Sequence, residues 1–418
     1  MVKASALYIV IIIALVIGIL CSSLIVVAYF YRYEYQKKFR QDHLQNNLSS
    51  GINILLAATD QSYSKPGTLS LFGNGDDSVS LQKFQWGVYD IGVVKAFIQH
   101  DTLYKAFSMA NTIDTSKWAA LYLLDDDRPV SVSGKTVING DAYLPKAGIQ
   151  EAYVDNRAYE GDKRLVLGKK YISKKKLPPL DSASLIRLGE YFSAKGDTVI
   201  GKDSVEQSFL KPIKVYDLKK SVQPLQHVTL SGNIIIRSDT TLTIDNSASL
   251  KDVLVFARTI IIKSGFKGNC QLFARDSISV EQDCHFSYPS CLAIIRLSKP
   301  KVNAQARIVL NADCTLSGHI LMYEANPSEL KPRISIGEKD TVTGNIYSQN
   351  ILELKKESVT SGSIFTGRFL YRTSFTTYEN YIINTTLNER TLSPYYLTSQ
   401  IVPVASKKKK ILQWLEGN

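Results

Sequence analysis

The sequence predicts a mainly β protein with a long N-terminal transmembrane α-helix. A parallel β-solenoid with three faces and about 18 residues per coil is expected next to a smaller α+β region. Two observations carry this prediction: residues 4–31 contain no charged side chain, and short apolar segments recur at a fixed spacing between residues 228 and 370. We expect residues 1–58 to form an anchor and stalk helix, 59–220 a β-rich α+β region, 221–372 the solenoid, and 373–418 a capping segment with a basic tail.

The composition is that of folded domains. Of the 418 residues, 44% are hydrophobic and 21% are charged, which excludes a disordered, collagen-like or disulfide-dense chain. The formal net charge is +12. A basic chain of this kind is attracted to anionic surfaces and polymers.

The uncharged run of residues 4–31 is longer than the ~20 residues that a helix needs to cross a bilayer. It is also longer than the apolar core of a signal peptide and does not end at a small-residue cleavage site, so we expect a retained single-pass anchor. Beyond it, Leu44, Leu48, Ile52 and Leu55 recur at helical spacing. The same helix is therefore expected to continue as a stalk.

The charges that flank the run leave its orientation open. Lys3 precedes it, whereas Arg32, Lys37, Lys38 and Arg40 follow it, and the positive-inside rule then places the large domain in the cytoplasm. The rule weakens for long domains. We expect an inner-membrane protein whose large domain is extracytoplasmic, with the cytoplasmic orientation as the alternative.

The start of the chain, Lys3-Ala4-Ser5-Ala6-Leu7 followed by a long Ile/Val/Leu run, resembles type IV pilin-like and pseudopilin-like proteins. The resemblance covers about 55 of the 418 residues. It implies a helix that is half embedded in the membrane and half packed on a β-rich domain. The chain differs from that family because it has no Gly-Phe cleavage site and no glutamate within the apolar run. An ordinary single-pass anchor is the alternative.

The region after the helix is expected to begin with a linker at residues 59–67, where Thr, Ser, Asp, Pro and Gly gather. Residues 84–88 alternate as in a half-buried strand, and residues 93–98 fit either a strand or a helix. Residues 130–144 alternate in the same way and fit one solenoid coil that precedes the main repeat.

A basic segment lies in the loop that we expect at residues 161–180. Its cations are Lys163, Arg164, Lys169, Lys170, Lys174, Lys175 and Lys176. Such a patch can bind an anionic polymer, lipid headgroups or nucleic acid by neutralising phosphates. A solvated loop is the alternative. Nucleic acid is not the expected partner, because no nucleic-acid-binding fold signature accompanies the patch.

The repeat is clearest where an apolar segment is followed by a glycine ten positions after its first residue. Ile308 leads to Gly318, Ile334 to Gly344, and Leu352 to Gly362. Earlier segments start at residues 242, 260 and 278, so most starts are separated by one period of about 18 residues, and the two intervals around residues 300 and 327 are longer. A solenoid needs such a period, because each coil buries its inward side chains only when coils stack. An antiparallel sandwich, the rival fold, does not predict constant spacing.

The repeat region resembles bactofilins, which are polymer-forming bacterial β-helix proteins. The resemblance covers residues 228–370 and rests on the degenerate G-x-I pattern of the coils. It implies an end-to-end assembly of solenoids. In this chain, residues 371–404 continue past the last coil and are expected to cap that end.

Four of the five cysteines lie in the repeat. Cys284 and Cys314 both follow a coil start by six positions, so consecutive coils would place them about 4.8 Å apart, within disulfide range. They form a candidate disulfide if the domain is exported, or a buried apolar ladder if it is cytoplasmic. No metal is expected at Cys284, His285 and Cys291, because a second ligand pair is missing.

No catalytic motif is present, and we nominate no catalytic, cofactor-binding or metal-binding residue. The triplet Asp125, Asp126 and Asp127 lacks the spacing of a calcium loop and is expected to be a solvated turn. Asp276 and Asp283 are the carboxylates that a β-helix polysaccharide enzyme would offer. At the C-terminus, residues 407–415 are expected to form a short basic helix that either contacts a membrane surface or packs on the solenoid.

These observations favour a bacterial, membrane-anchored structural or assembly protein of the cell envelope, such as a pilus-like or secretion-associated accessory component, and not an enzyme. Its expected partners are the lipid bilayer, through residues 4–31, other envelope proteins and an anionic polymer. A cytoplasmic, bactofilin-like scaffold held at the membrane is the first alternative. A β-helix enzyme acting on polysaccharide is the second.

Overall fold

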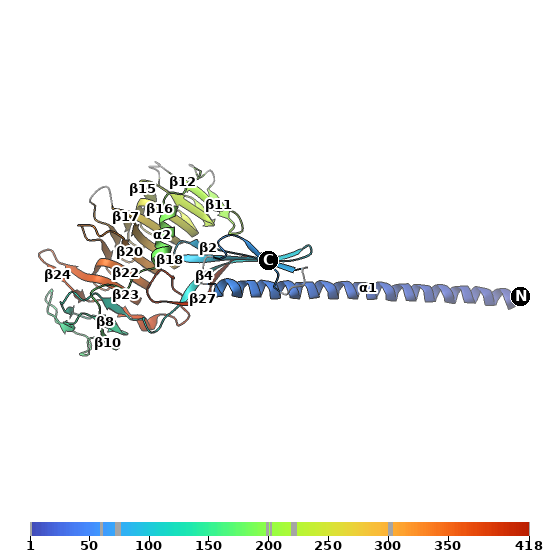
Figure 1. The fold of residues 1–418 in the computed structure, drawn as a ribbon, viewed down its shortest axis with the longest axis horizontal. Coiled ribbons are helices and arrows are strands. Elements are labelled where there is room, and N and C mark those ends of the chain that lie inside the picture. Colours follow the sequence, from blue (N-terminus) through green and yellow to red (C-terminus); the bar gives the residue numbers. More distant parts are fainter. Residues whose placement is uncertain are drawn as a thin grey trace. The chain divides into compact units, whose positions relative to one another are not determined.

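The structure is a computed structural model that describes residues 2–58, 62–71, 77–197, 200, 203–218, 224–299 and 304–417, with side chains from residue 6 onward. The protein is mainly β, with 49% strand and 17% helix, and it begins with one long apolar helix. This confirms the predicted fold class at that level (Figure 1). Residues 59–61 of the predicted linker lie outside the described residues.

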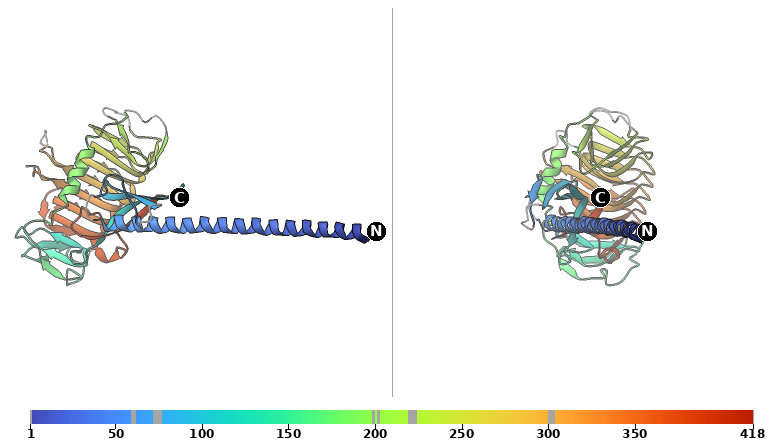
Figure 2. Two further views of the ribbon diagram at one scale, coloured as in Figure 1. Left: turned by 45° about the vertical axis from the view of Figure 1, so that its right-hand side comes forward. Right: turned by 90° about the vertical axis from the view of Figure 1, so that its right-hand side faces the viewer.

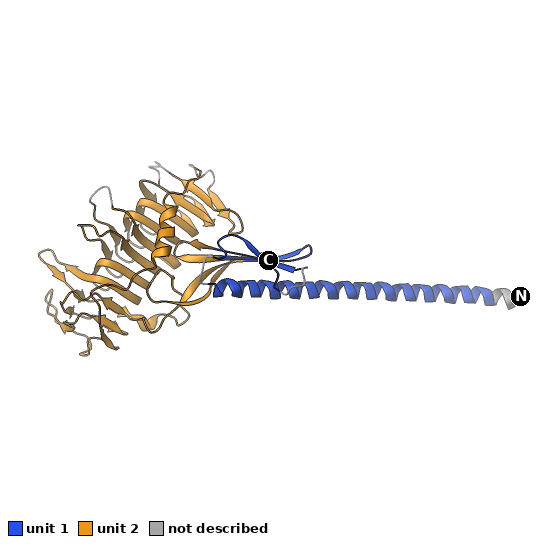
Figure 3. Ribbon diagram, in the orientation of Figure 1, with its two compact units in different colours: residues 1–83, 92–105, 417–418 blue, residues 84–91, 106–416 orange. Residues whose placement is uncertain are grey.

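The chain divides into two compact units, coloured separately in Figure 3. The first comprises residues 1–83, 92–105 and 417–418, and the second comprises residues 84–91 and 106–416.

The first unit is dominated by α1 (Val2–Ala57), a single uninterrupted helix. Its segment from Ala6 is apolar and long enough to cross a membrane. Large apolar side chains in this part, from Leu7 to Tyr31, are exposed. The prediction of one helix that contains both an apolar run and a stalk is therefore confirmed.

The C-terminal part of α1 packs on strands of the same unit. The predicted stalk residues Leu44, Leu48, Ile52 and Leu55 are buried. Gly51 lies on the same face of the helix, and a Cβ atom there would lie only 2.8 Å from side-chain carbons of Val79 and Val94. Glycine is thus required at residue 51 for the close approach of helix and sheet.

A five-stranded sheet has the order β1-β2-β3-β4-β27. Its strands are β1 (Gly67–Leu69), β2 (Asp77–Trp86), β3 (Tyr89–Ile98), β4 (Asp101–Ile113) and β27 (Ala405–Gly417). Residues 93–98, for which the sequence left a strand or a helix open, thus form a strand as part of β3. The short helix predicted at 407–415 is wrong. β27 lies beside β4, where Asn111 donates a hydrogen bond to the Ser406 carbonyl and Phe107 packs on Trp414, and pairing of this kind overrides local helix propensity.

The second unit contains a long sheet whose pairings within the described residues are parallel, apart from β23 with β24. Its strands along the main repeat are β11 (Ser204–Gln207), β12 (Lys214–Asp217), β13 (Thr229–Gly232), β14 (Ile234–Arg237), β15 (Thr241–Ile244), β16 (Ser249–Ile262), β17 (Lys267–Val280), β18 (His285–Arg296), β19 (Arg307–Leu310), β20 (Thr315–Glu324), β21 (Arg333–Ile336), β22 (Thr341–Leu354) and β23 (Val359–Arg372). Figure 2 shows them stacked in successive layers.

The register of this sheet follows the spacing of the sequence repeat. Ile260 pairs with Ile278, Ile278 with Ile308, and Ile308 with Ile334. Insertions in the longer intervals, such as the segment around residue 300, therefore leave the strand register intact.

Apolar residues at alternate positions point to a common interior, which is one continuous cluster of buried side chains. The recurring glycines lie within β20, β22 and β23, where Gly318 pairs with Gly344 and Gly344 with Gly362. Gly318, Gly344 and Gly362 have φ angles of 141°, 134° and 146°, which side chains with a Cβ rarely adopt. This is why glycine recurs at that position.

Strands from an earlier part of the chain extend the same sheet beyond β23. They are β5 (Leu121–Leu123), β7 (Val137–Asn139), β8 (Ala142–Leu144) and β10 (Lys170–Ile172). β5 pairs with β23, β8 with β5, and β10 with β8. The prediction that residues 130–144 precede the main repeat is therefore wrong, because their strands join its other end.

The remaining strands surround that end. They are β6 (Val130–Ser133), β9 (Ile149–Glu151), β24 (Thr377–Glu379), β25 (Tyr381–Ile383) and β26 (Thr386–Asn388), followed by the short 3-10 helix η1 (Glu389–Thr391). β26 pairs with both β23 and β7. Residues after β23 thus continue the sheet and join it to the strands from earlier in the chain.

The helix α2 (Ser182–Tyr191) lies beside the stacked strands of the second unit (Figure 2). Its N-cap is Asp181, whose side chain accepts a hydrogen bond from the backbone N–H of Ser184. At its other end, the rings of Tyr191 and Phe192 pack on Phe256, with centroids 5.5 and 5.0 Å away. These contacts hold the C-terminus of α2 against β16.

Candidate functional site

The acidic triplet is spread over three separate sets of contacts. The buried Asp125 carboxylate accepts hydrogen bonds from the backbone N–H groups of Asp127 and Lys146. Asp126 forms an ion pair with Arg368 at 3.1 Å, and Asp127 forms one with Lys175. Across the described ranges, no group of three or more His, Cys, Asp or Glu side chains has the arrangement of a metal site.

The structure places the basic segment on both sides of β10 and within it, at the end of the long sheet. All seven predicted cations are exposed. Arg164 is paired with Asp162 at 2.7 Å, and Lys175 with Asp127 at 3.0 Å. Exposed pairs of this kind contribute little stability and exchange partners readily. The other five cations form no ion pair within the described residues and stay available to an anion.

An aromatic column leads to this basic segment. Phe365, Tyr122, Tyr143 and Tyr171 stack in that order, with successive ring centroids 5.7, 5.1 and 4.9 Å apart. Tyr171, the last ring, is 39% exposed and lies in β10 between two exposed residues. The end of the long sheet thus carries a partly exposed tyrosine ring in the same strand as Lys170.

Cys284 and Cys314 are buried free thiols just before the paired strands β18 and β20, where His285 pairs with Thr315. The Cys284 thiol donates a 3.3 Å hydrogen bond to the Lys263 carbonyl, and the Cys314 thiol donates a 3.1 Å bond to the Glu281 carbonyl. The Cys314 thiol beside it lowers the pKa of Cys284 below its ordinary value, because a neighbouring donor stabilises the thiolate. The backbone N–H of Cys314 donates a 2.8 Å hydrogen bond to the buried carboxylate of Asp340 in the next coil. The disulfide between the two cysteines stays a prediction.

A cavity of about 510 Å³ lies between the C-terminal end of α2 and strands β16–β18. Its lining includes Phe192, three arginines from successive strands (Arg258, Arg275 and Arg296) and Lys299. The two carboxylates of the lining are Asp239 and Asp276. The other carboxylate noted in the sequence, Asp283, lies at a corner with φ 57° and does not line this cavity.

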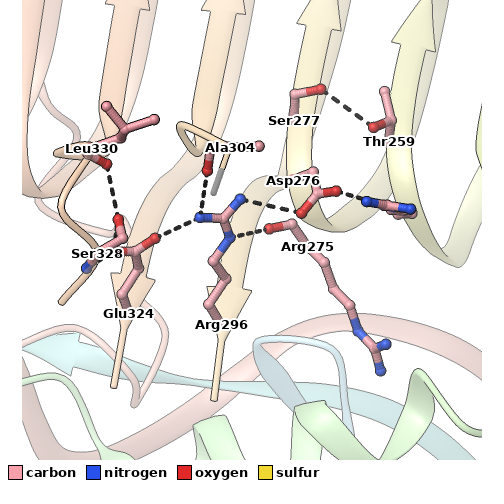
Figure 4. A network of polar contacts seen from close by, with 10 residues as sticks. Thr259, Arg275, Asp276, Ser277, Arg296, Ala304, Glu324, Ser328 and Leu330 are labelled. Carbon is pink, nitrogen blue, oxygen red and sulfur yellow. Dashed lines mark hydrogen bonds and ion pairs between the residues drawn. The ribbon is translucent and has the colours of Figure 1, made fainter. Parts of the chain in front are cut away.

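Arg296 forms the fixed part of the wall (Figure 4). Its side chain is only 4% exposed, and it donates to Asp276 at 3.1 Å and to Glu324 at 2.9 Å. It also donates to the backbone carbonyls of Arg275 and Ala304. Because these contacts satisfy the buried guanidinium, Arg296 is a structural cation.

Both carboxylates of the lining are already paired with arginine. Asp276 accepts a 2.6 Å hydrogen bond from Arg258 in addition to the bond from Arg296, and the contact raises the pKa of Arg258. Asp239 accepts a 2.5 Å bond from Arg237, which lies outside the lining. Neither carboxylate is therefore free to repel an incoming anion.

Arg275 is held differently. Its guanidinium carbon lies 4.7 Å from the ring centroid of Phe192, a cation–π contact, and in Figure 4 its side chain points away from the Asp276 network. It has no carboxylate partner within the part of the chain that the structure describes. Arg275 is thus an oriented cation with its hydrogen-bond donors still available.

Our sequence reasoning missed these arginines, although a signal is present. An arginine ends the apolar run of four successive coils, at Ile236-Arg237, Ala257-Arg258, Ala274-Arg275 and Ile295-Arg296. The apolar starts and the glycines define the repeat, and a charge at the end of an apolar run is not part of that pattern. The chain matches no protein-family model, no curated protein and no solved structure.

Proposed function

We propose that the chain is a single-pass, membrane-anchored structural or assembly protein of a bacterial cell envelope, a pilus-like or secretion-associated accessory component. The observation that carries this proposal is the division of α1 into two parts. Apolar side chains in residues 6–31 are exposed, whereas Leu44, Leu48 and Leu55 are buried against strands of their own unit. The resemblance to pilin-like proteins implies the same division.

We further infer that the long sheet is a three-faced parallel β-solenoid with about 18 residues per coil. The parallel registers support this inference, since Ile260 pairs with Ile278 and Val342 with Thr360, each one period later along the chain. The recurring positive-φ glycines support it too. A solenoid offers an extended, repetitive surface that suits protein partners in an assembly.

Three partners follow from the proposal. Residues 4–31 would contact the lipid bilayer, the exposed faces of the solenoid would contact other envelope proteins, and the basic segment around β10 would contact an anionic polymer. The proposal assigns the chain no catalytic activity, no cofactor and no metal. The large domain is placed outside the inner membrane.

Thiol labelling in intact cells tests the placement. The variant Lys163→Cys adds an exposed thiol in the basic segment, and Cys21→Ser removes the exposed thiol of α1. The remaining cysteines are at most 1% exposed, so the Cys21→Ser chain without the new thiol is the matched control. A membrane-impermeant maleimide is expected to label the double variant without lysis of the inner membrane. Labelling only after lysis would overturn the extracytoplasmic placement.

The assembly role is tested separately, by photo-crosslinking in cells. A photo-reactive amino acid at Tyr171, which is 39% exposed, is expected to give a discrete adduct of higher mass, and one at Lys263, whose side chain is 46% exposed, serves as a comparison. Absence of any discrete adduct from exposed positions along the long sheet would count against an assembly component.

A cytoplasmic, bactofilin-like scaffold is the second candidate. The specific observation in its favour is the flank of α1, where Lys3 stands before the apolar run and Arg32, Lys37 and Lys38 stand after it. Labelling only after lysis, together with end-to-end polymers of the purified protein, would make this the leading function. A polysaccharide-active enzyme is less favoured, because both carboxylates of the cavity are held by arginines.

A further inference from the structure

We propose that the cavity between α2 and β16–β18 binds an acidic saccharide, whose carboxylate is held by Arg275, with Arg258 as a second cation of the same lining. This site is independent of the membrane anchor and of the basic segment around β10. It concerns what the long sheet binds and not where the chain is placed.

The first step of the argument is charge. The cavity lining carries Arg258, Arg275, Arg296 and Lys299 against the carboxylates Asp239 and Asp276. Both carboxylates are neutralised by arginine, and Arg296 is buried and already donates four hydrogen bonds within the protein. The cations that remain at the surface of the cavity favour an anion, and in a partly enclosed site this attraction is screened less than on an open surface.

The second step is orientation. The Arg258 side chain is fixed through its Nε, which donates to Asp276, so its terminal nitrogens are left for a ligand. Arg275 is fixed by its stacking on Phe192, which orients its planar group without using its donors. One oriented guanidinium group with free donors matches the planar, bidentate geometry of a carboxylate.

The third step is size and chemistry. A volume of about 510 Å³ lies within the range of small-ligand sites, ~300–1,000 Å³, and exceeds what an inorganic anion needs. The lining also combines the apolar side chains of Ile295 and Leu297 with the polar side chains of Asp239 and Ser298. Apolar surface suits the C–H faces of a sugar ring, and the polar groups suit its hydroxyls. A saccharide with one acidic group per ring uses all of these features.

The test is a calorimetric titration of the full-length protein in detergent micelles. The probe is trigalacturonate, and maltotriose is the neutral trisaccharide of matched size. Trigalacturonate is expected to bind at least tenfold more tightly than maltotriose, with an affinity that falls as salt is raised. Equal affinity for the two sugars would overturn the proposal.

Variants locate the site. Arg275→Gln is expected to weaken trigalacturonate binding at least tenfold, and Arg275→Lys, which keeps the charge but loses the planar group, is expected to fall between it and the wild type. Lys263→Gln, an exposed cation of the neighbouring surface that does not line the cavity, is the matched control and should leave the affinity unchanged. Circular dichroism verifies that each variant is folded.

Two further outcomes also decide the matter. If inorganic phosphate binds the cavity as tightly as trigalacturonate does, the cavity is a simple anion site and the saccharide proposal is wrong. If binding is lost in Lys170→Gln and kept in Arg275→Gln, the saccharide binds the basic segment instead and the cavity proposal is overturned. Either result leaves the labelling experiment on membrane placement unaffected, so the two proposals fail separately.

Discussion

The centre of the long sheet and one of its ends share one apolar interior but are built from the chain in different ways. The central rungs, strands β16–β18, β20, β22 and β23, follow one another along the sequence, and their strands are 10–14 residues long. The terminal rungs, strands β5, β7, β8 and β10, are three residues long, and the first of them pairs Leu121 with Ile364. Consecutive coils leave a periodic trace in the sequence, whereas a distant segment that completes the stack does not.

The difference has an energetic side. Closing a longer loop costs additional conformational entropy, which grows slowly with loop length, so long-range rungs need compensating contacts. The central rungs bury nearly every inward side chain, and so does β5, while the residues of β10, the outermost of the terminal rungs, are all exposed. We therefore expect substitutions in the central rungs to cost more stability than substitutions in β10.

The largest expected effect separates the two regions directly. Phe286 in β18 is 1% exposed and lies 5.5 Å from Phe266, measured between ring centroids. Phe286→Ala should lower the free energy of unfolding by about 3–5 kcal/mol, because it leaves a cavity in a closely packed interior. Urea unfolding of the full-length protein in detergent, followed by circular dichroism, measures the loss.

Tyr171→Ala is the comparison in the terminal rungs. The ring stacks on Tyr143 at 4.9 Å but is 39% exposed, so its loss is expected to be about 1 kcal/mol. Equal losses for the two variants would show that the terminal rungs are as important to stability as the central ones.

Much of the fold could be predicted from the residues themselves. The apolar run and the spaced leucines specify α1, since Leu44, Leu48 and Leu55 are the residues that its packed part buries. The spacing of Ile260 and Ile278 appears directly in the strand register. These features are local or periodic, and such features are what a sequence pattern records.

The features that were missed depend on contacts between distant segments. Nothing near Leu121 indicates that it pairs with Ile364, and nothing in the four lysines 407–410 indicates a strand. At the candidate site, Arg275 is defined by its stacking on Phe192, which comes from a helix that no periodic signal connects to the repeat. Such partners are set by tertiary structure, which overrides local preference.

Two glycines, one in each region, allow the same comparison for the backbone. Gly344 has φ 134°, and a Cβ atom there would overlap the carbonyl oxygen of Gly318. Gly344→Ala should therefore cost about 3 kcal/mol from backbone strain and crowding. Gly148, in a turn beside the terminal rungs, has φ 76° and open space around its Cα, so Gly148→Ala is the matched control and should cost about 1 kcal/mol. Urea midpoints of both variants measure the difference, and a larger loss at Gly148 would contradict it.

The buried Asp340 of the central rungs predicts a pH dependence. Burial raises its pKa to about 6, above the value of ~3.9 in an unfolded chain. A raised carboxyl pKa favours the protonated folded state, so this contribution to stability is complete below pH ~4 and is lost as pH rises through about 6. The loss amounts to about 3 kcal/mol at most.

The variant Asp340→Asn isolates this contribution. Between pH 4 and pH 7, the unfolding free energy of the wild type should fall relative to that of the variant. Asp155, near the terminal rungs, has a pKa shift of the opposite sign. Hydrogen bonds from Lys356 and Tyr371 lower its pKa. Its contribution is lost as pH falls, so Asp155→Asn should cost more at pH 7 than at pH 3. A pH-independent difference for Asp340→Asn would argue against a protonated carboxyl in the folded coil.

The smallest expected effect concerns surface ion pairs, where the two regions should look alike. Lys263 and Glu281 form a 2.7 Å pair between consecutive coils, and both side chains are partly exposed. Lys263→Ala should cost less than about 1 kcal/mol, because solvent screens the pair and holding two long side chains costs entropy.

Lys175, paired with Asp127 beside the terminal rungs, is still more exposed, and Lys175→Ala should give no measurable change. Any loss of unfolding free energy in Lys263→Ala should shrink as salt is raised to 0.5 M, because salt screens the ion pair and does not affect the packed interior. A salt-independent loss would mean that the Lys263 stem contributes packing to the central rungs, and the contrast between the regions would then extend to their surfaces.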